Sequence, residues 1–413
     1  MVSGDVMTAA RSVLVIGGGI VGLSSALALR ERGFDVTLLD DAPERPCASW
    51  GNIGHIATEQ VEPLASWRMT MQMPRRLMSI GGPVSFPPSA IATWLPFGLR
   101  LLAAGTPSRF ARGKAALSAL LEQALPAWRI RVATIGATDL LRETGHIVAW
   151  ERAASATRGR RALARPAASA AVSCHDLTDE QGELLRATIS RPIIDAMRYE
   201  GTASIADPGS ALDALRTAFL AMGGRLETGM AGREHVTGPA TDLVVVAAGV
   251  RSKRLMEALG HRVPIIAERG YHIQSPSAHW PAGLPPIVFE DRALVVSGFT
   301  SGLRATSFVE FTRHDAPPDP RKWARLRRHV QDLGLSFGDD TATWYGSRPT
   351  LPDYLPAIGR STRNPRILYA FGHQHLGLTL GPMTGVIIAA LATGERSPVD
   401  LSAFAVDRFA AAF

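Results

Sequence analysis

Cysteine is nearly absent from this chain of 413 residues, which contains two, Cys47 and Cys174. Neither lies in a CxxC pair or at the spacing of a metal site, which excludes a disulfide framework and a zinc finger. We therefore expect a reduced, cytoplasmic protein. The first residues also lack a basic stretch followed by an apolar one, so we expect no secretion signal.

Lysine is scarce as well, and most basic residues are arginines in a chain with a formal net charge of +7. The densest arginine group lacks the interleaved aromatic residues that stack bases, so we expect no nucleic-acid partner. This group, expected to be a solvated helix face, comprises Arg158, Arg160, Arg161 and Arg165. HExxH, Walker A and Ser-His-Asp patterns are missing too, so we expect no metal centre.

Long apolar runs are few. Phe86–Gly105 is the most apolar stretch outside the glycine-rich start, but three prolines and Arg100 interrupt it. A membrane-spanning helix needs about 20 mostly uninterrupted apolar residues, so this stretch is not expected to span. Core packing is the simplest expectation for it, and we predict that it contributes to the substrate-domain surface and does not span a membrane. A substrate lid and a surface that touches lipid, on the inner face of the cell membrane, are the alternatives.

The sequence does contain a strand-helix-strand pattern near its start. Ser12–Ile16 and Asp35–Leu39 predict strands, and the apolar spacing of Leu23–Arg32 predicts a helix between them. The first strand runs directly into Gly17-Gly-Gly-Ile-Val-Gly22, which matches GxGxxG. This order of elements is typical of a Rossmann-type dinucleotide site.

Each glycine of the motif has a role at such a site. Gly17 permits the tight turn, Gly19 lets the backbone approach a pyrophosphate, and Gly22 lets helix and strand pack closely. The helix N-terminus faces the phosphate charge, and an acid at the end of the second strand accepts hydrogen bonds from the ribose. The nucleotide contacts expected here are Gly17, Gly19, Ile20, Val21, Gly22, Asp40 and Asp41.

The rest of the chain shows further helical and strand patterns. We expect helices over most of Pro107–Ala170, after a capping box at Thr178, and at Asp207–Met222, Pro320–Leu333 and Leu376–Thr393. We expect a hairpin-like pair at Asp139–Arg142 and His146–Trp150, and strands at Asp242–Gly249, Ile287–Glu290, Ala293–Gly298, Arg304–Phe311 and Arg366–Phe371. The short strands between 251 and 345 indicate an antiparallel sheet with a covering helix.

The late strand favours FAD over NAD as the nucleotide. GxGxxG alone does not separate the two cofactors. FAD enzymes commonly complete the nucleotide fold with an apolar strand far from the glycine motif. Here the apolar stretch Val244–Gly249 follows the motif by about two hundred residues. We therefore expect FAD, with Ala248 and Gly249 beside it.

Five motifs together resemble the D-amino acid oxidase superfamily of flavoproteins, in particular its bacterial D-amino acid dehydrogenase branch. They run in the family's order from Ser12 to Glu395 and are VIGGGIVGLSSALAL (15–29), ASWGNIGHI (48–56), VVVAAGVRS (244–252), GSRPTLPDYLPAIG (346–359) and GHQHLGLTLGPMTG (372–385). The resemblance implies an α/β fold in which a Rossmann-type FAD-binding domain is interleaved with an α+β substrate domain on a mainly antiparallel sheet. We assign residues 1–83, 204–252 and 345–413 to the first domain and 84–203 and 253–344 to the second.

The resemblance also implies flavin contacts. In this family the loop after the acidic strand end passes beside the pyrophosphate and the flavin, which here gives Ser49, Asn52, Gly54 and His55. The start of the last helix faces the flavin pyrimidine edge, where its N–H groups stabilise the charge of the reduced ring. The contacts inferred there are Gly372, His375, Leu376, Gly377, Leu378 and Thr379.

Arg348 is the candidate anchor of a substrate carboxylate. It lies in Gly346-Ser-Arg-Pro349, which matches the family's GxRP motif, and a guanidinium fork matches a planar carboxylate. Tyr271 and His373 are further catalytic candidates, each with a purely structural role as the alternative. The weaker candidates are His272, Glu59 and Arg304.

The resemblance implies oxidation of an amino acid by hydride transfer from Cα to flavin N5, which gives an imino acid. We expect a small or cyclic D-amino acid, such as D-proline or hydroxy-D-proline. The alternatives are a glycine- or sarcosine-type amine oxidase and a flavin-bearing electron-relay subunit of a hetero-oligomer. The electron acceptor is expected to be oxygen, a quinone or a partner protein.

Overall fold

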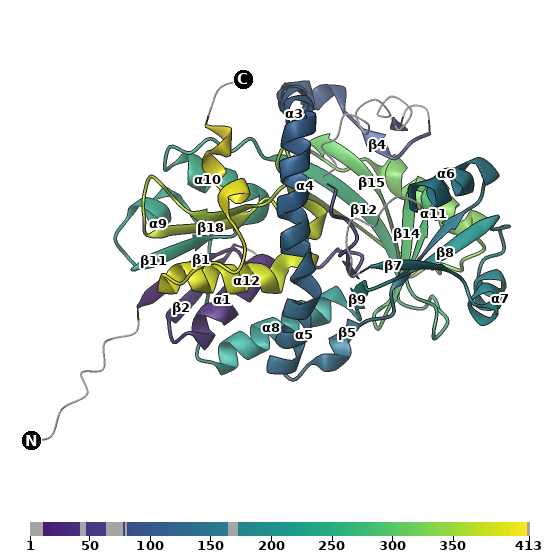
Figure 1. Ribbon diagram of the computed structural model, residues 1–413, viewed down its shortest axis with the longest axis horizontal. Coiled ribbons are helices and arrows are strands. Elements are labelled where there is room, and N and C mark those ends of the chain that lie inside the picture. The colour runs from purple at the N-terminus through teal and green to yellow at the C-terminus, as the bar shows by residue number, and fades with distance from the viewer. Residues whose placement is uncertain (1–10, 42–46, 63–76, 79–80, 164–171, 411–413) are drawn as a thin grey trace, which may run out of the picture.

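Two β-sheets lie side by side in the computed structural model of this chain, the first on the left of Figure 1 and the second on the right. The structure describes residues 11–41, 47–62, 77–78, 81–163 and 172–410. Figure 1 shows helix α4 (Pro107–Glu122) running across the front between the two sheets.

The first sheet contains the predicted strand-helix-strand unit at its centre. Its order is β10-β2-β1-β11-β18-β17, with β1 Ser12–Ile16, β2 Asp35–Asp40, β10 Arg225–Thr228, β11 Leu243–Val246, β17 Ala357–Arg360 and β18 Ile367–Phe371. Strand β1 pairs in parallel with β2 and with β11, so residues about 230 apart in sequence are neighbours. Parallel strands covered on both faces read as continuous apolar runs, which explains why both β1 and β11 were recognisable in the sequence.

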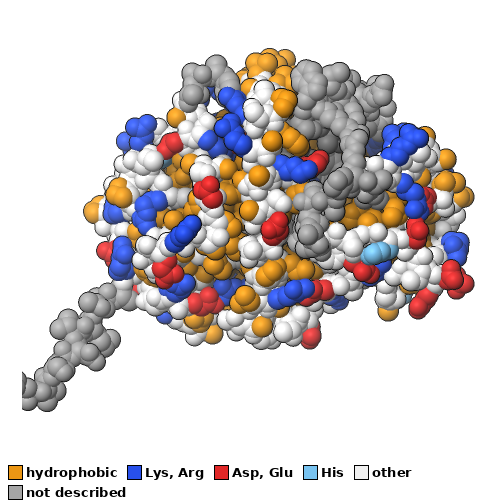
Figure 2. Space-filling model, viewed as in Figure 1, with side chains coloured by type: hydrophobic (Ala, Val, Ile, Leu, Met, Phe, Trp, Pro, Cys, Tyr) orange, Lys and Arg blue, Asp and Glu red, His pale blue; other side chains and the backbone are white. Residues whose placement is uncertain are grey.

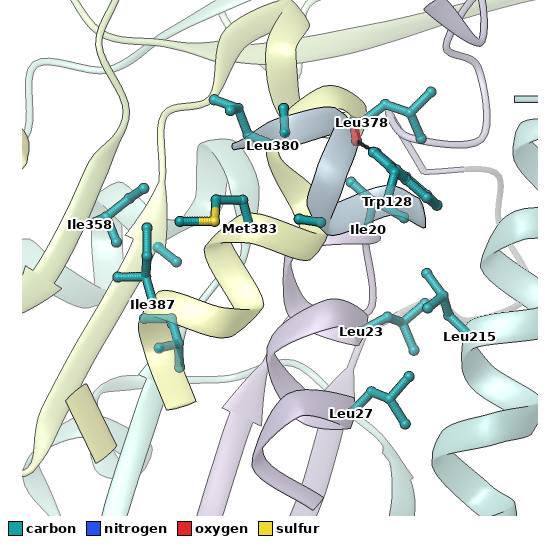
Figure 3. Packing of buried hydrophobic residues seen from close by; sticks show 14 of the residues in the cluster. Ile20, Leu23, Leu27, Trp128, Leu215, Ile358, Leu378, Leu380, Met383 and Ile387 are labelled. Atoms are coloured by element: carbon teal, nitrogen blue, oxygen red, sulfur yellow. Dashed lines mark hydrogen bonds between the residues drawn. The ribbon is translucent and has the colours of Figure 1, made fainter. Parts of the chain in front are cut away.

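Helices α1 (Ile20–Glu31) and α12 (Gly377–Thr393) pack tightly against each other on this sheet. In Figure 3, Leu23 and Leu27 of α1 point toward Leu215 of α8 (Pro208–Ala221), and Trp128 of α5 (Ala124–Thr134) donates a 2.9 Å hydrogen bond to the Leu378 carbonyl. Glycines make the approach possible, because a Cβ on Gly385 would lie 2.4 Å from the Ser24 carbonyl oxygen. Residues 374–393 are long and apolar enough to cross a membrane, but most of this stretch is buried in the protein core.

The second sheet is mainly antiparallel, as predicted. Its order is β16-β12-β15-β14-β13-β6-β8-β7, with β4 beside β15; the strands are β4 Val84–Ser85, β6 His146–Trp150, β7 Ser173–Asp176, β8 Asp195–Glu200, β12 Ile266–Ser275, β13 Ile287–Phe289, β14 Leu294–Phe299, β15 Gly302–Thr312 and β16 Ala342–Thr350. Helix α11 (Pro320–Asp332) packs against β12 and β15, which confirms the expected covering helix. The domain boundaries given above stay a prediction.

Several helices surround the sheets. The remaining ones of five or more residues in the described chain are α3 Ile91–Ala104, α6 Ala153–Leu163, α7 Asp179–Thr188, α9 Arg233–Thr237 and α10 Ser252–Glu257. The capping box is confirmed, because the Thr178 hydroxyl accepts from the Gln181 N–H and the Gln181 side chain accepts from the Thr178 N–H. Of the arginine group, Arg165 lies outside the described residues, whereas Arg160 is exposed and pairs with Asp176 and Asp195, which fits a solvated helix face.

The expected hairpin at 139–150 is wrong. Leu141–Arg142 forms β5, which pairs with β9 (Ala203–Ile205) in a small sheet together with β3 (His55–Ile56), while β6 pairs with β8 and β13 in the large sheet. All five residues of β6 are buried, so this strand needs partners on both sides, and a two-strand hairpin would not provide them.

The core placement of Phe86–Gly105 holds for one face of a helix only, and the other face contributes to the surface. This stretch forms a short 3₁₀ turn and then α3, whose buried residue is Phe97. The large apolar side chains Ile91, Leu95, Leu99 and Leu102 are exposed by 40% to 61%. Apolar composition alone predicts burial, but a helix at the edge of the molecule can cover the core with one face only.

Candidate functional site

A cavity of about 2150 Å³ lies between the two sheets. Its walls come from the carboxyl ends of β1 and β11, from the loop at 47–52, from the start of α12 and from β12, β15 and β16 of the second sheet. Pockets for single small molecules usually measure about 300–1,000 Å³, so this cavity has room for a dinucleotide and a second, smaller molecule. It lies outside the carboxyl ends of parallel strands, where such folds bind nucleotides.

The glycine-rich turn forms a cradle that any side chain would fill or distort. Gly17 has a φ of +111°, and a Cβ on it would lie 2.5 Å from the Ala247 carbonyl oxygen. A Cβ on Gly22 would lie 1.8 Å from the Gly17 carbonyl oxygen, so Gly22 serves packing and does not line the cavity. Gly19 lines the cavity, and a Cβ there would meet just Ser49 Oγ, at 3.4 Å, among the described atoms. The turn at the start of α1 therefore fits a pyrophosphate.

The two acids after β2 line the same cavity. An added Cβ on Gly18 would lie 2.4 Å from Asp40 Oδ2, so the carboxylate lies against the glycine turn, as a ribose acceptor should. Asp41 forms an ion pair with Arg251, which follows β11. Ala248 and Gly249 line the cavity beside them. The dinucleotide region thus draws on β1, β2 and β11, as an adenine dinucleotide site requires.

The loop 47–52 is held from both sides. Ser49 Oγ accepts the Ile20 N–H at 3.1 Å, which ties the loop to the first turn of α1. From behind, the buried Arg304 donates to the carbonyls of Trp50 and Asn52, and a His272 ring nitrogen lies 3.1 Å from the Gly51 carbonyl. Neither Arg304 nor His272 is among the described residues that line the cavity, so their part is to position the loop.

The start of α12 forms another wall. Of the predicted contacts, Ile20, Val21, Ser49, Asn52, His55, His373, His375, Gly377 and Leu378 line the cavity, whereas Gly54, Gly372, Leu376 and Thr379 do not. Gly54 and Gly372 have φ values of +80° and +79°, and the Thr379 hydroxyl accepts the Ala57 N–H at 3.0 Å, so these three shape the backbone behind the wall. Leu376 is buried in the hydrophobic core. A contact inferred from motif position alone cannot separate a lining residue from the one behind it.

Arg348 reaches the cavity from β16 and is fixed by a buried carboxylate. Its Nη1 lies 3.3 Å from Oε1 of Glu268, a residue of β12 that is 2% exposed. The hydroxyls of Thr350 and Tyr354 each donate to Glu268 Oε2 at 3.0 Å, so the carboxylate is fully engaged. An added Cβ on Gly270 would lie 2.5 Å from Arg348 Nη2, so this glycine makes room for the guanidinium.

Tyr271 does not belong to the cavity, which corrects its prediction as a catalytic residue. Its side chain is fully buried on the other face of β12, where its hydroxyl donates to Glu310 at 2.5 Å and accepts the Asp319 N–H at 3.2 Å. Neighbours along a strand point to opposite faces. Gly270 faces the cavity, so Tyr271 faces away from it.

His55, Glu59 and His146 form a polar cluster in the cavity wall. His55 Nε2 lies 2.8 Å from Glu59 Oε1, and the His146 ring packs edge-on against His55 with 4.6 Å between ring centroids. Burial would raise the pKa of Glu59, but the charge of His55 and their hydrogen bond lower it to about 2. Burial would lower the pKa of His55, and the charge of Glu59 outweighs this and raises it. Both shifts favour the charged forms, so they favour an ion pair between the two side chains.

The remaining histidines of the site are neutral. Burial lowers the pKa of His146 to about 3, and the charge of His55 adds to this. Burial also lowers the pKa of His373 and of His375 to about 3. The charge of Arg348 also lowers the pKa of His375 and that of Glu59 raises it, and the Nε2 of His375 lies against the Gln60 side-chain oxygen.

The three polar side chains of the cluster place potential metal-ligand atoms within 4.8 Å of one another. Two of them already bond to each other, and the third, His146, lies 3.1 Å from the Thr202 hydroxyl. The expectation of no metal centre stays a prediction.

Sequence reasoning missed Glu268 and His146 and ranked Glu59 low. Glu268 stands three residues before Tyr271 in the same strand, and strand alternation would have placed it with Gly270 on the face of the cavity. His146 comes from a segment whose pairing was mispredicted, and no local pattern around it signals a site.

Comparisons with known proteins show the family of this chain. The family model described as "DAO: FAD dependent oxidoreductase" matches residues 12–391. A D-amino-acid oxidase of Bradyrhizobium diazoefficiens is 31% identical, and the match spans 98% of this chain and the whole length of that protein. D-amino acid dehydrogenase 2 of Pseudomonas aeruginosa is 30% identical over 94% of this chain and 96% of its own length.

Solved structures show the same fold. L-proline dehydrogenase from P. horikoshii aligns with a TM-score of 0.70 at 16% identity, over 97% of this chain and 98% of that one. Glycine oxidase from Geobacillus kaustophilus aligns with a TM-score of 0.69 at 17% identity, over 96% and 99%. The predicted two-domain α/β architecture is therefore confirmed.

Proposed function

Because the chain belongs to the DAO family of FAD-dependent oxidoreductases, we propose that it oxidises a small or cyclic D-amino acid to an imino acid. The protein is an FAD-dependent oxidoreductase that acts on amino acids. D-Proline and hydroxy-D-proline are the proposed substrates.

The observation that carries the proposal is the pair of opposite charges in one cavity. Arg348 offers guanidinium N–H groups for a carboxylate, and a planar fork binds a carboxylate with two parallel hydrogen bonds. The Glu59–His55 pair and His375 line the same cavity. An α-amino acid carries a carboxylate and an amine one carbon apart, and this arrangement complements both.

FAD, when bound, would accept the hydride, that is, one proton with two electrons, that leaves the substrate Cα. In the proposal, the turn 17–19 and Asp40 hold its pyrophosphate and ribose, and Ser49 and Asn52 line its flavin end. The N–H groups at the start of α12 face the negative charge of the reduced ring. The protein's remaining task is orientation, which Arg348 performs by fixing the carboxylate.

Amine deprotonation is the proton step that the residues must support. A substrate ammonium must lose a proton before its nitrogen lone pair can form the imine. In the proposal, Glu59 attracts the ammonium, and the amine loses its proton to solvent. A pKa of about 3 makes His375 too weak a base for this step, so the neutral imidazole, whose Nε2 lies against the Gln60 side-chain oxygen, is left to orient the substrate.

Substrate choice distinguishes the proposal from its alternatives. Anaerobic mixing of the purified enzyme with D-amino acids and N-methyl amino acids, followed by flavin absorbance, measures which compounds bleach the flavin. Bleaching by D-proline or hydroxy-D-proline supports the proposal, and bleaching by glycine or sarcosine alone replaces it with the amine-oxidase alternative. Bleaching by none of them favours the electron-relay subunit.

The electron acceptor is the second part of the proposal. Oxygen, a quinone and a partner protein are the candidates. Reoxidation of the bleached enzyme by air, by a soluble quinone or by neither separates the three. A quinone would be met at the inner face of the cell membrane, so peripheral membrane contact belongs to the proposal in that case.

A further inference from the structure

The net charge of this protein is concentrated in one part of its sequence. From Pro63 to Leu121 there is no Asp or Glu, and there are seven basic residues: Arg68, Arg75, Arg76, Arg100, Arg109, Arg112 and Lys114. The whole chain contains 44 basic and 37 acidic residues, so the rest of the chain has 37 of each and is formally neutral. The entire formal charge of +7 therefore belongs to this segment.

Helix α3 lies within that segment and exposes an apolar stripe. Ile91, Leu95, Leu99 and Leu102 are spaced by four, four and three residues, which places them on one face of the helix. Their exposed fractions are 50%, 46%, 61% and 40%. Figure 2 shows hydrophobic side chains gathered at the top of the molecule, where Figure 1 shows α3.

The opposite face of α3 holds the helix on the second sheet. Phe97 is buried in an apolar cluster with Phe311 of β15, and Trp94 packs against the same cluster. A helix that is apolar on both faces is usually enclosed by protein or by lipid. A groove of about 990 Å³ opens beside α3, and Leu95, Leu99 and Leu102 of the exposed stripe line it together with side chains of the Phe311 cluster.

We propose that the exposed face of α3 docks onto an anionic lipid bilayer. The apolar stripe would enter the boundary between headgroups and acyl chains, and Arg100 on the same helix, together with Arg109 and Arg112 on α4, would meet the negative headgroups. A protein partner or a second copy of this chain could cover an apolar face too. The complete absence of carboxylates over this segment, in a chain that is otherwise balanced, favours a uniformly negative partner.

This docking goes beyond amino-acid oxidation, because lipid binding needs no substrate. Val309 links the two surfaces, since it packs against the α3 cluster and also lines the main cavity. A docked enzyme would therefore hold its cavity close to the bilayer.

The test uses FAD-loaded full-length enzyme and two kinds of vesicle, phosphatidylcholine alone and phosphatidylcholine with phosphatidylglycerol, in a sedimentation assay. We expect binding to the anionic vesicles, weakened by added salt because salt screens exposed charges. Leu99→Glu should weaken it by ~10-fold to 100-fold, since a buried leucine becomes a charge that the headgroups repel. Arg100→Gln should weaken it by about 5-fold.

Ile130→Glu is the matched control, because Ile130 is also an apolar helical residue, 68% exposed, but lies outside the segment. It should bind vesicles like the wild type. FAD content and turnover with a soluble dye, measured for all variants, show whether each is folded, and they report on catalysis separately from docking.

Three outcomes would overturn the proposal: no binding to anionic vesicles by folded wild-type enzyme, equal binding by Leu99→Glu, or equal loss in Ile130→Glu. A dimer that Leu99→Glu converts to monomer, without vesicle binding by either form, would assign the face to a second copy of the chain.

Discussion

Nη1 of Arg348 lies 3.3 Å from Oε1 of Glu268, so the proposed carboxylate anchor is itself oriented by a carboxylate. Glu268 is 2% exposed and also accepts hydrogen bonds from Thr350 and Tyr354, so its position hardly depends on solvent. Its charge fixes one edge of the guanidinium and leaves the other N–H groups for a ligand. An anchor that is already ordered loses little rotamer freedom when substrate binds.

Arg348→Ala should weaken kcat/KM for the amino-acid substrate by roughly 30-fold to several thousand-fold. Truncating one partner of a charged, buried hydrogen-bonded pair costs on the order of 2–5 kcal/mol. Arg348→Lys should recover part of the loss, because an ammonium keeps the charge but not the planar fork. Steady-state kinetics on FAD-loaded protein measure both effects.

Glu268 provides the control for this prediction. Arg348→Ala leaves the buried Glu268 without its cation, so the single variant should also melt at a lower temperature. Adding Glu268→Gln should restore part of the melting temperature and none of the activity. Unchanged kinetics in Arg348→Ala, with FAD retained, would refute the anchor role.

Gly19→Val should abolish FAD retention without unfolding the protein. In the described structure a Cβ at this position meets just Ser49 Oγ at 3.4 Å, so the clash falls on the bound pyrophosphate. Gly22→Val is the contrasting variant, because its Cβ would lie 1.8 Å from the Gly17 carbonyl and should disrupt packing itself. Flavin absorbance and far-UV circular dichroism distinguish a folded apoprotein from an unfolded chain. A Gly19→Val protein that keeps its flavin contradicts the cradle.

Glu59→Gln should lower stability most between about pH 4.5 and 6.5. The lowered pKa of Glu59 adds stability that is fully present above 4.5 and lost as pH falls through about 2. The raised pKa of His55 adds stability that is fully present below 6.5 and lost as pH rises through its folded value. Between these limits the ion pair should contribute about 1.5–3 kcal/mol.

Melting temperatures of wild type and Glu59→Gln across this pH range measure that difference directly. Taking the difference cancels the titration of groups that both proteins share. A gap that stays constant from acid to alkaline pH would show that the pair does not titrate as an ion pair.

Tyr271→Phe should cost stability and spare catalysis. The hydroxyl accepts the Asp319 N–H and donates to the buried Glu310, so its loss leaves polar groups unpaired at a cost of about 1–3 kcal/mol. The kcat/KM should stay within about 2-fold of wild type, because the side chain faces away from the cavity. A loss of more than 10-fold in a fully FAD-loaded variant would return Tyr271 to the active site.

The nucleotide half of the site was predictable because its signals are local. GxGxxG, the acid after β2 and the apolar strand β11 can each be read within a few residues, and the structure brings them to one cavity. Arg348, the proposed anchor, was singled out by its motif and lines the same cavity. Tyr271 was misplaced because a motif does not show which face of a strand each residue points to. Gly270, its neighbour in the strand, faces the cavity.

The missed features depend on distant pairing. β6 lies between β8 and β13, and nothing between 139 and 150 indicates those partners. Once the strand is misplaced, His146 cannot be assigned to a site. The exposure of α3 is a similar case, because its composition predicts burial and only the three-dimensional arrangement shows which face is covered.

The pairing of β1 with β11 sets a constraint on synthesis. Ile16 is paired with Val246, and β11 in turn pairs with β18, which ends at Phe371. At typical translation rates of about 5–20 residues per second, the ribosome needs roughly 10–45 s to go from β1 to β11. During that interval the nascent chain contains the glycine turn but not Ala247, against which Gly17 closes. FAD binding should therefore follow the synthesis of β11, and a chain truncated before β11 would have an incomplete FAD site.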